Sequence, residues 1–220
     1  SPKPVWGVKI AVYYESLCPD SKKFITGQLA PVWRDMRGLL KVKLVPYGKS
    51  TRDKINEKWE FNCHHGAEEC YGNKVQACIL KDRKLQDTEK MDLVICLMGQ
   101  TNPDKSLDIA QSPTLFPSLP SPIPFPSLPS PITLFPLKKC LEQVGKSAES
   151  SKLKKCADGA QGDSLLASYG DKSDLVQRPL AFVPTVIINE KFDQALQDES
   201  MTNLKTVVCR VAPNKPSICN

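Results

Sequence analysis

The sequence has no run of about twenty apolar residues, which is the length that a membrane-spanning helix needs. It also lacks a concentrated basic arm: 30 Lys and Arg against 24 Asp and Glu give a net charge of +6, spread along the chain. No Asn-x-Ser/Thr sequence occurs, so an N-linked glycan has no attachment site. These absences predict no membrane insertion, no nucleic-acid partner and no N-linked glycan that could direct the protein to the lysosome.

Cysteine, in contrast, is abundant, with nine residues in a chain of 220. Thiols are kept reduced in the cytosol, whereas proteins of oxidising compartments use cysteine for disulfides. The sequence starts at Ser1 without an initiator methionine or an apolar leader, which is typical of a mature secreted product. We therefore expect a secreted, extracellular protein, with the lumen of lysosomes or endosomes as the alternative.

The first fifty residues have the pattern of a strand, a helix and a second strand. Residues 8–16 are β-branched and aromatic, residues 19–38 carry apolar side chains at helical spacing, and residues 41–46 alternate apolar and polar. Pro31 should kink the helix and Gly38 should end it. Such a crossover is right-handed and makes its two strands parallel.

A stretch of the same character returns at residues 181–189, so the segment between, 50–178, is interpreted as an insertion in a single α/β domain that spans 1–220. The periodicity of apolar residues predicts helices in this insertion at 52–60, 73–81, 138–145 and 164–169. The insertion also contains six of the nine cysteines.

Residues 112–136 stand apart within the insertion, because nine of the nineteen prolines lie there and FPSLPSPI at 116–123 recurs at 125–132. Proline removes backbone donors and restricts φ, so we expect an extended, low-complexity surface loop with neither helix nor sheet. A tolerated loop expansion is the simplest interpretation. Two alternatives are that the segment binds a domain that recognises proline-rich peptides, or that it docks onto an extracellular partner.

Cys18 lies between the first strand and the helix, directly before Pro19. At such a position the helix dipole and free N–H groups stabilise a thiolate, so Cys18 is a candidate nucleophile and should be partly exposed. A dithiol oxidoreductase needs a resolving thiol three residues later, where this chain has Ser21. A hydroxyl cannot displace a thiolate, so a dithiol cycle would stop at the mixed disulfide unless an outside thiol completed it.

A second motif identifies a family. The stretch CHHGAEECYGNKVQAC resembles the signature of the gamma-interferon-inducible lysosomal thiol reductase (GILT) family at Cys63, His65, Gly66, Glu69, Cys70, Asn73 and Cys78, with His64 in place of a glutamine. The resemblance extends to YYESLCPDS, LVPYGK and AFVPTVIIN. It implies a thioredoxin-like fold with a helical, disulfide-rich insertion, and for the family the reduction of protein disulfides in acidic compartments. That activity uses a Cys-x-x-Cys pair, and here the pair is Cys18 and Ser21.

The resemblance also gives Pro184 a role, because thioredoxin-like folds place a cis-proline opposite the active-site cysteine, where it lines the substrate groove. Eight cysteines remain for disulfides once Cys18 is set aside. Closeness in sequence suggests Cys140–Cys156 and Cys209–Cys219, which leaves Cys63, Cys70, Cys78 and Cys96 to pair among themselves.

A zinc site is the alternative use of the motif, since Cys63, His64, His65 and Cys70 are all residue types that bind zinc. Three adjacent ligands do not have the usual spacing, and cysteines of secreted proteins are usually oxidised. We therefore expect no metal and no cofactor. His64 and His65 could instead sense acidification or simply pack in the insertion.

Two functions follow from these observations. The favoured hypothesis is a secreted GILT-like protein that has lost dithiol reductase activity and binds a protein or cell surface, of host or pathogen, in a defence-related setting. The alternative is a monothiol disulfide reductase or isomerase that uses Cys18 with an external thiol. An unpaired Cys18 in an oxidising compartment further predicts a disulfide-linked dimer or a glutathione adduct.

Overall fold

The computed structural model describes residues 7–100, 134–213 and 215–219. Most of the proline-rich segment 112–136 therefore lies outside the described residues. Its last three residues begin a helix, α5 (Leu134–Gln143), so the expectation that the whole segment is non-helical is wrong at that end. Pro136 is tolerated there because the N–H groups of a first helical turn have no partner within the helix.

A three-stranded sheet forms the centre of the fold, in the order β2-β1-β5. Strand β1 (Val8–Tyr14) runs parallel to β2 (Leu40–Pro46) and antiparallel to β5 (Thr185–Ile188). The parallel pair confirms the strand-helix-strand unit predicted for the first fifty residues. The late strand is also confirmed, although it is shorter than residues 181–189.

The helix that connects β1 to β2 is continuous but irregular. It consists of α1 (Pro19–Phe24), the π-helical turn η1 (Ile25–Leu29), α2 (Ala30–Met36) and a final 3-10 turn, η2 (Arg37–Leu39). The π-helical turn ends at Leu29, two residues before Pro31, whose missing N–H and bulky ring disturb the regular hydrogen-bond ladder. The predicted end near Gly38 is confirmed, and the kink at Pro31 stays a prediction.

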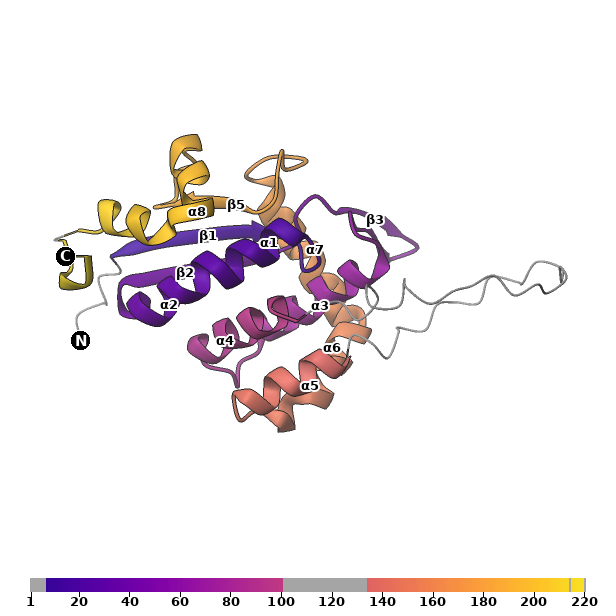
Figure 1. Ribbon diagram of the computed structural model, residues 1–220. Coiled ribbons are helices and arrows are strands. Elements are labelled where there is room, and N and C mark those ends of the chain that lie inside the picture. The colour runs from indigo at the N-terminus through magenta and orange to yellow at the C-terminus, as the bar shows by residue number, and fades with distance from the viewer. Residues whose placement is uncertain (1–6, 101–133, 214, 220) are drawn as a thin grey trace, which may run out of the picture.

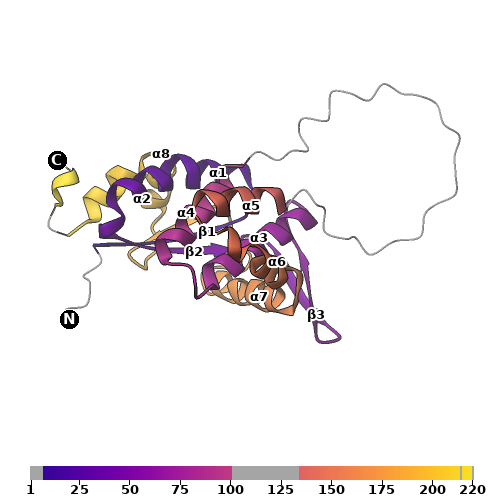
Figure 2. The same cartoon turned by 90° about the horizontal axis from the view of Figure 1, so that it is seen from below.

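The side chains of β1 point alternately to the two faces of the sheet, and each face has its own cluster of buried residues. Val8, Ile10, Val12 and Tyr14 belong to the larger cluster, together with residues of α1, η1, α2 and α8 (Gln194–Val211). Tyr13 points the other way, into a smaller cluster with Val45 of β2 and residues of α3 and α7. Figures 1 and 2 show the sheet between these two groups of helices. This two-sided burial explains the nearly continuous apolar sequence of β1.

The segment between β2 and β5 begins with a hairpin, where the sequence predicted a helix at 52–60. Strands β3 (Thr51–Ile55) and β4 (Lys58–Asn62) pair antiparallel around Asn56 and Glu57, which both have positive φ. Two such residues make the tight turn whose twist matches that of a hairpin. The ring centroids of Trp59 and Phe61 lie 6.5 Å apart. These two residues are two positions apart in β4 and share one of its faces, as the two-residue period of a strand requires.

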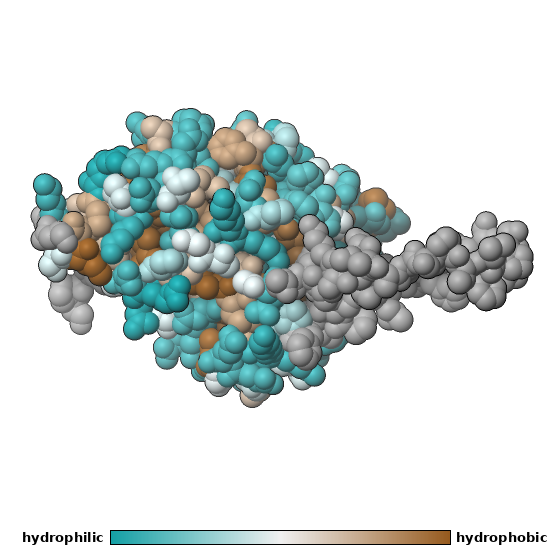
Figure 3. Space-filling model, in the orientation of Figure 1, coloured by the Kyte–Doolittle hydropathy of each residue, from teal (hydrophilic) through white to brown (hydrophobic). Residues whose placement is uncertain are grey.

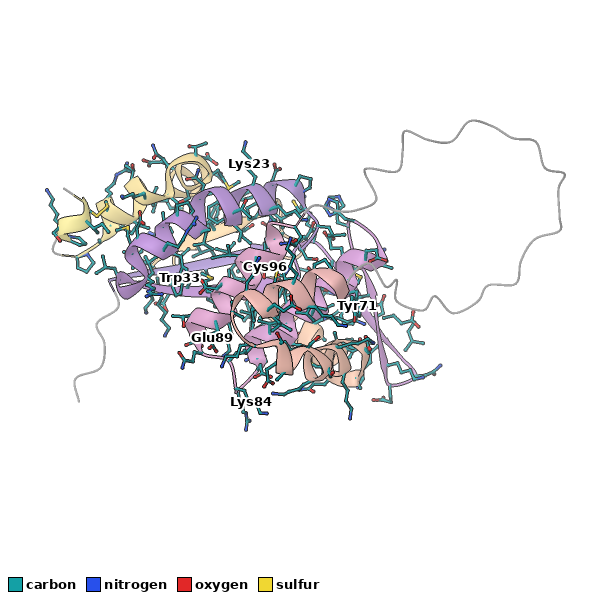
Figure 4. All side chains as sticks on the ribbon, turned by 60° about the horizontal axis from the view of Figure 1, so that its bottom comes forward. Lys23, Trp33, Tyr71, Lys84, Glu89 and Cys96 are labelled. Atoms are coloured by element: carbon teal, nitrogen blue, oxygen red, sulfur yellow. A yellow bond between two sulfur atoms is a disulfide. The ribbon has the colours of Figure 1, made fainter. Side chains whose placement is uncertain are left out.

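The other regular elements that the structure describes in this segment are helices. They are α3 (Ala67–Lys81), α4 (Asp87–Met98), α5, the 3-10 turn η5 (Ser147–Glu149), α6 (Ser150–Asp158) and α7 (Ala160–Asp174). The helix predicted at 73–81 lies within α3, and the helix predicted at 164–169 lies within α7. The helix predicted at 138–145 overlaps α5 but extends two residues beyond its end. Figure 4 shows Tyr71 on α3, whose hydroxyl donates to Asp158 on α6 over 2.8 Å.

Four disulfides use every cysteine except Cys18: Cys63–Cys70, Cys78–Cys156, Cys96–Cys140 and Cys209–Cys219. The predicted Cys209–Cys219 bridge is confirmed, and the predicted Cys140–Cys156 bridge is wrong. These two cysteines lie on α5 and α6, but Cys140 faces α4, where Figure 4 labels Cys96, and Cys156 faces α3. Helix packing, rather than closeness in sequence, decides the partners.

The last described element is a short 3-10 turn, η6 (Ser217–Cys219), which lies at the same end of the molecule as the start of β1 (Figure 1). The face of the molecule in Figure 3 is mainly hydrophilic, with small apolar areas between polar ones. Among the described residues, no helix is both long enough and apolar enough to cross a membrane.

Candidate functional site

Cys18 is positioned by the end of β1 and the start of α1. It is the N-cap of α1, with the extended backbone angles φ −62° and ψ 124°, and Pro19 occupies the first helical position. The first intrahelical bond runs from the Lys22 N–H to the Cys18 carbonyl oxygen, over 3.0 Å. Pro19 has no N–H, so it removes one of the donors that a helix start leaves without a partner, and the thiol lies at the positive end of the helix.

The loop before β5 faces this thiol. The Val183–Pro184 peptide bond is cis, as the resemblance predicted, and the Cys18 Sγ lies 3.9 Å from the Val183 carbonyl oxygen. Gln197 of α8 holds the loop: its Nε2 donates to the Pro184 carbonyl oxygen over 3.1 Å, and its Oε1 accepts from the Val186 N–H over 2.6 Å. Sequence reasoning missed Gln197, since a polar residue in an amphipathic helix carries no signal of such a role.

The thiol is less accessible than the sequence suggested. Cys18 is 6% exposed, so the expectation that it is partly exposed is wrong. The cis-proline loop packs against its sulfur through the Val183 carbonyl oxygen. Nearby, the Lys22 Nζ donates to the Gln100 carbonyl oxygen over 2.9 Å, and burial lowers the pKa of this ammonium group.

Ser21 lies one helical turn after Cys18 and is completely buried. Its Oγ accepts a hydrogen bond from the Glu15 N–H, over 3.4 Å. Ser21 therefore ties the helix to the preceding loop. Because the other eight cysteines are all in disulfides, no second thiol is available to Cys18 within the chain.

The signature residues pack onto the loop that leads to Cys18. Asn73 Oδ1 accepts from the Ser16 N–H over 2.9 Å, and Glu69 Oε2 accepts from the Leu17 N–H over 3.3 Å. The Ser16 Oγ in turn donates to the Glu69 carbonyl oxygen over 3.1 Å. The signature thus supports Ser16 and Leu17, the two residues directly before the thiol.

The turn between β4 and α3 is closed by the Cys63–Cys70 disulfide, and it contains His64, His65 and Gly66. Gly66 has φ +82°, a value that glycine adopts without strain, and it caps α3. Cys78 is the exception in the signature, because it bridges away from this turn to Cys156. Since Cys63 and Cys70 are oxidised, the zinc alternative that used their thiolates is wrong.

Two carboxylates are buried under this turn, Glu15 and Glu69, both with no exposed surface. Burial raises the pKa of Glu69, and the nearby charge of Glu15 adds to the increase, against hydrogen bonds from His65. The His65 N–H and Nδ1 lie 3.0 Å and 2.7 Å from the two oxygens of Glu69. Sequence reasoning did not single out Glu15, although a charged residue directly after an apolar strand was a signal for it.

Comparison with known proteins agrees with this geometry. The family model "Gamma interferon inducible lysosomal thiol reductase (GILT)" matches residues 9–112. GILT-like protein 1 of Drosophila melanogaster is 32% identical over 97% of this chain and 78% of its own length. The chain belongs to the GILT family.

A vertebrate GILT protein also matches nearly the whole chain. The gamma-interferon-inducible lysosomal thiol reductase of Mus musculus is 27% identical over 97% of this chain and 72% of its own length. Among solved structures, oxidised BdbD from Bacillus subtilis has a TM-score of 0.55 at 15% identity, covering 94% of this chain and 90% of its own. Chlamydia trachomatis DsbA has a TM-score of 0.54 at 14% identity, over 92% and 89%. These likenesses establish the thioredoxin-like fold of this GILT protein.

Proposed function

We propose that this GILT protein has no dithiol reductase cycle of its own and acts by binding a protein partner at the groove between Cys18 and Pro184. The observation that carries the proposal is the buried hydroxyl of Ser21, which bonds to the Glu15 N–H where a dithiol cycle needs a thiol. With the other eight cysteines in disulfides, nothing in the chain can resolve a mixed disulfide at Cys18.

The groove supports binding without turnover. The cis bond before Pro184 lies where the Val183 carbonyl oxygen comes within 3.9 Å of the Cys18 sulfur, directly before β5, which is an edge strand of the sheet. An extended peptide can add its backbone to such an edge, and affinity then comes from main-chain hydrogen bonds. The buried thiol favours this use, since a side chain with 6% exposure is a poor nucleophile toward a large partner.

We place this activity outside the cell or in an endosomal or lysosomal lumen, because four disulfides persist only where thiols are not kept reduced. A protein or cell surface of host or pathogen, in a defence-related setting, is the class of partner that we propose. The "gamma-interferon-inducible" name of the murine relative supports the defence-related setting.

Monothiol chemistry is the second candidate, favoured by the position of Cys18 at the positive end of α1. The Cys18 thiolate would attack a substrate disulfide R–S–S–R′, forming a Cys18–S–S–R bond and releasing R′–S⁻, which takes up a proton. One glutathione thiolate would displace R–S⁻ and leave Cys18 bound to glutathione. A second would regenerate Cys18 and leave as glutathione disulfide, so that two glutathiones supply the two electrons.

A turnover assay distinguishes the two candidates. The wild-type chain and a Cys18→Ala variant are incubated with a disulfide-bonded substrate protein, with and without glutathione, at acidic and neutral pH. Binding without turnover predicts that both proteins match the glutathione background. A Cys18-dependent rate that requires glutathione would establish the monothiol enzyme, and a Cys18-dependent multiple-turnover rate without glutathione would contradict both candidates.

A further inference from the structure

A second set of side chains, separate from the Cys18 thiol, meets under the turn between β4 and α3. Glu15 follows β1, and His64 and His65 lie in the turn; one ligand atom from each of the three falls within 4.8 Å of the others. We propose that Glu15, His64 and His65 form a binding site for a divalent first-row transition-metal ion such as Zn²⁺.

Glu15 is the fixed part of this site. Its side chain has no exposed surface, and its Oε1 accepts from the Lys49 N–H over 2.8 Å. Its Oε2 is also buried and has no hydrogen-bond partner, but it lies 3.2 Å from the His65 Nδ1 and 3.4 Å from the His64 Nδ1. A buried carboxylate oxygen without a partner is costly, and a cation between it and the two imidazoles would remove that cost.

The fold makes room for this carboxylate. Gly48 has φ +60°, and a Cβ atom there would lie 2.1 Å from the Glu15 Cγ and 2.5 Å from its Oε1. Only a residue without a side chain leaves that space for Glu15. The position of the carboxylate is therefore set by the turn after β2 and by the Lys49 backbone.

The distances suit the coordination geometry of zinc. When two ligand atoms each lie about 2.0–2.1 Å from a tetrahedral ion, they are about 3.3–3.4 Å apart. The two contacts of Glu15 Oε2, at 3.2 Å and 3.4 Å, already have this spacing. Two imidazoles and one carboxylate suit Zn²⁺, Co²⁺ or Ni²⁺, whereas Mg²⁺ and Ca²⁺ prefer oxygen ligands alone.

The histidine side of the site opens to solvent. The side chain of His64 is 56% exposed and that of His65 is 32% exposed, which leaves an entry path and a position for a water ligand. When the ion binds, His65 Nδ1 gives its lone pair to it and Nε2 keeps the proton. The ion thus takes the place of the proton in the contact between the His65 Nδ1 and the Glu69 Oε2.

Glu69 and the nearby disulfide hold the ligands in place. Glu69 Oε1 accepts from the His65 N–H over 3.0 Å, which fixes the backbone of this ligand. Glu69 Oε2 lies 2.7 Å from the His65 Nδ1, so it adds negative charge next to the ion. The Cys63–Cys70 bridge closes the turn around both histidines. The ligands therefore come from a cross-linked turn and a buried strand end.

The test uses the full chain with its disulfides intact and a Cys18→Ser substitution, which removes its one free thiol as a competing ligand. Calorimetric titration with ZnCl₂ should show one saturable site, and titration with MgCl₂ should show none. His64→Gln, His65→Gln and Glu15→Gln should each weaken Zn²⁺ binding by about tenfold or more. Asp53→Asn, which changes an exposed carboxylate on the β3–β4 hairpin, is the matched control and should bind as the parent does.

His64→Gln is the decisive variant, because its half-exposed side chain can be replaced without disturbing the core; far-ultraviolet circular dichroism checks its fold. Bound Co²⁺ should give the intense visible absorption of a tetrahedral site, and His64→Gln should weaken it. Absence of saturable Zn²⁺ binding, or binding that neither histidine substitution alters, would overturn the proposal. None of these measurements uses thiol chemistry, so the result is independent of the proposed function.

Discussion

Ser21 is the residue that separates this chain from a dithiol mechanism. Ser21→Cys should allow a disulfide between Cys18 and the introduced thiol, because both positions lie on the first turn of α1. In a disulfide-reduction assay with a dithiol reductant, we expect the variant to exceed the wild-type rate by about tenfold or more.

Ser21→Ala is the control for this experiment. It removes the acceptor of the Glu15 N–H but adds no thiol, so its rate should stay at the wild-type level. A correctly folded Ser21→Cys protein with no gain in rate would show that the groove, and not only the resolving group, is incompatible with turnover.

Gly48 offers a second prediction at the scale of single residues. An alanine there would have both the positive φ of +60° and a contact of 2.1 Å with Glu15. Gly145→Ala is the matched control, because Gly145 has φ +68° but nothing within 4 Å of its added Cβ. In urea unfolding we expect Gly145→Ala to lose about 1–2 kcal/mol and Gly48→Ala to lose about 1–3 kcal/mol more. Equal losses would mean that Glu15 moves aside freely.

At the scale of elements, Asp82 joins the end of α3 to α6. It caps α3, accepts from the Lys84 and Leu85 N–H groups over 2.6 Å and 3.2 Å, and is paired with Lys152 of α6. Burial alone would raise the pKa of Asp82, but the hydrogen bonds from Lys152 and from these two backbone groups outweigh it and lower the pKa.

A lowered carboxyl pKa stabilises the fold above the ordinary aspartate pKa, and this stabilisation is lost as the pH falls toward the folded-state value. Asp82→Asn should therefore reduce the free energy of unfolding at pH 7 by about 1 kcal/mol, since Lys152 is half exposed and its contribution is screened. Below about pH 4 the difference from wild type should narrow. Urea unfolding at both pH values measures it, and a difference independent of pH would contradict an electrostatic origin.

At the scale of the whole molecule, the disulfide pattern predicts one reactive thiol in a chain of 24.4 kDa. Non-reducing mass spectrometry after alkylation in denaturant should find one label, at Cys18, and the four bridges of the structure. Because Cys18 is 6% exposed, oxidising conditions should give a glutathione adduct more readily than a disulfide-linked dimer. Cys18→Ala should abolish both species, and any dimer that survives this substitution would show exchange among the four bridges.

Much of the core fold could be predicted from the sequence, because its signals are local. The apolar run of β1, the helical spacing after Pro19 and the alternation in β2 depend on neighbouring residues only, and a right-handed crossover then makes the strands parallel. The hairpin at β3 and β4 was missed because its positive-φ turn uses Asn56 and Glu57, without the glycine that usually marks such a turn.

The sequence by itself determined the abundance of cysteine, the GILT resemblance and the serine three residues after Cys18, since each follows from which residues are present and in what order. Only the tertiary structure decided what depends on distant segments. It paired Cys78 with Cys156 and Cys96 with Cys140, because the facing surfaces of helices choose disulfide partners. It buried Cys18 against the cis-proline loop, 165 residues away, and it brought Glu15 to His64 and His65, because packing joins segments that carry no sequence signal for one another.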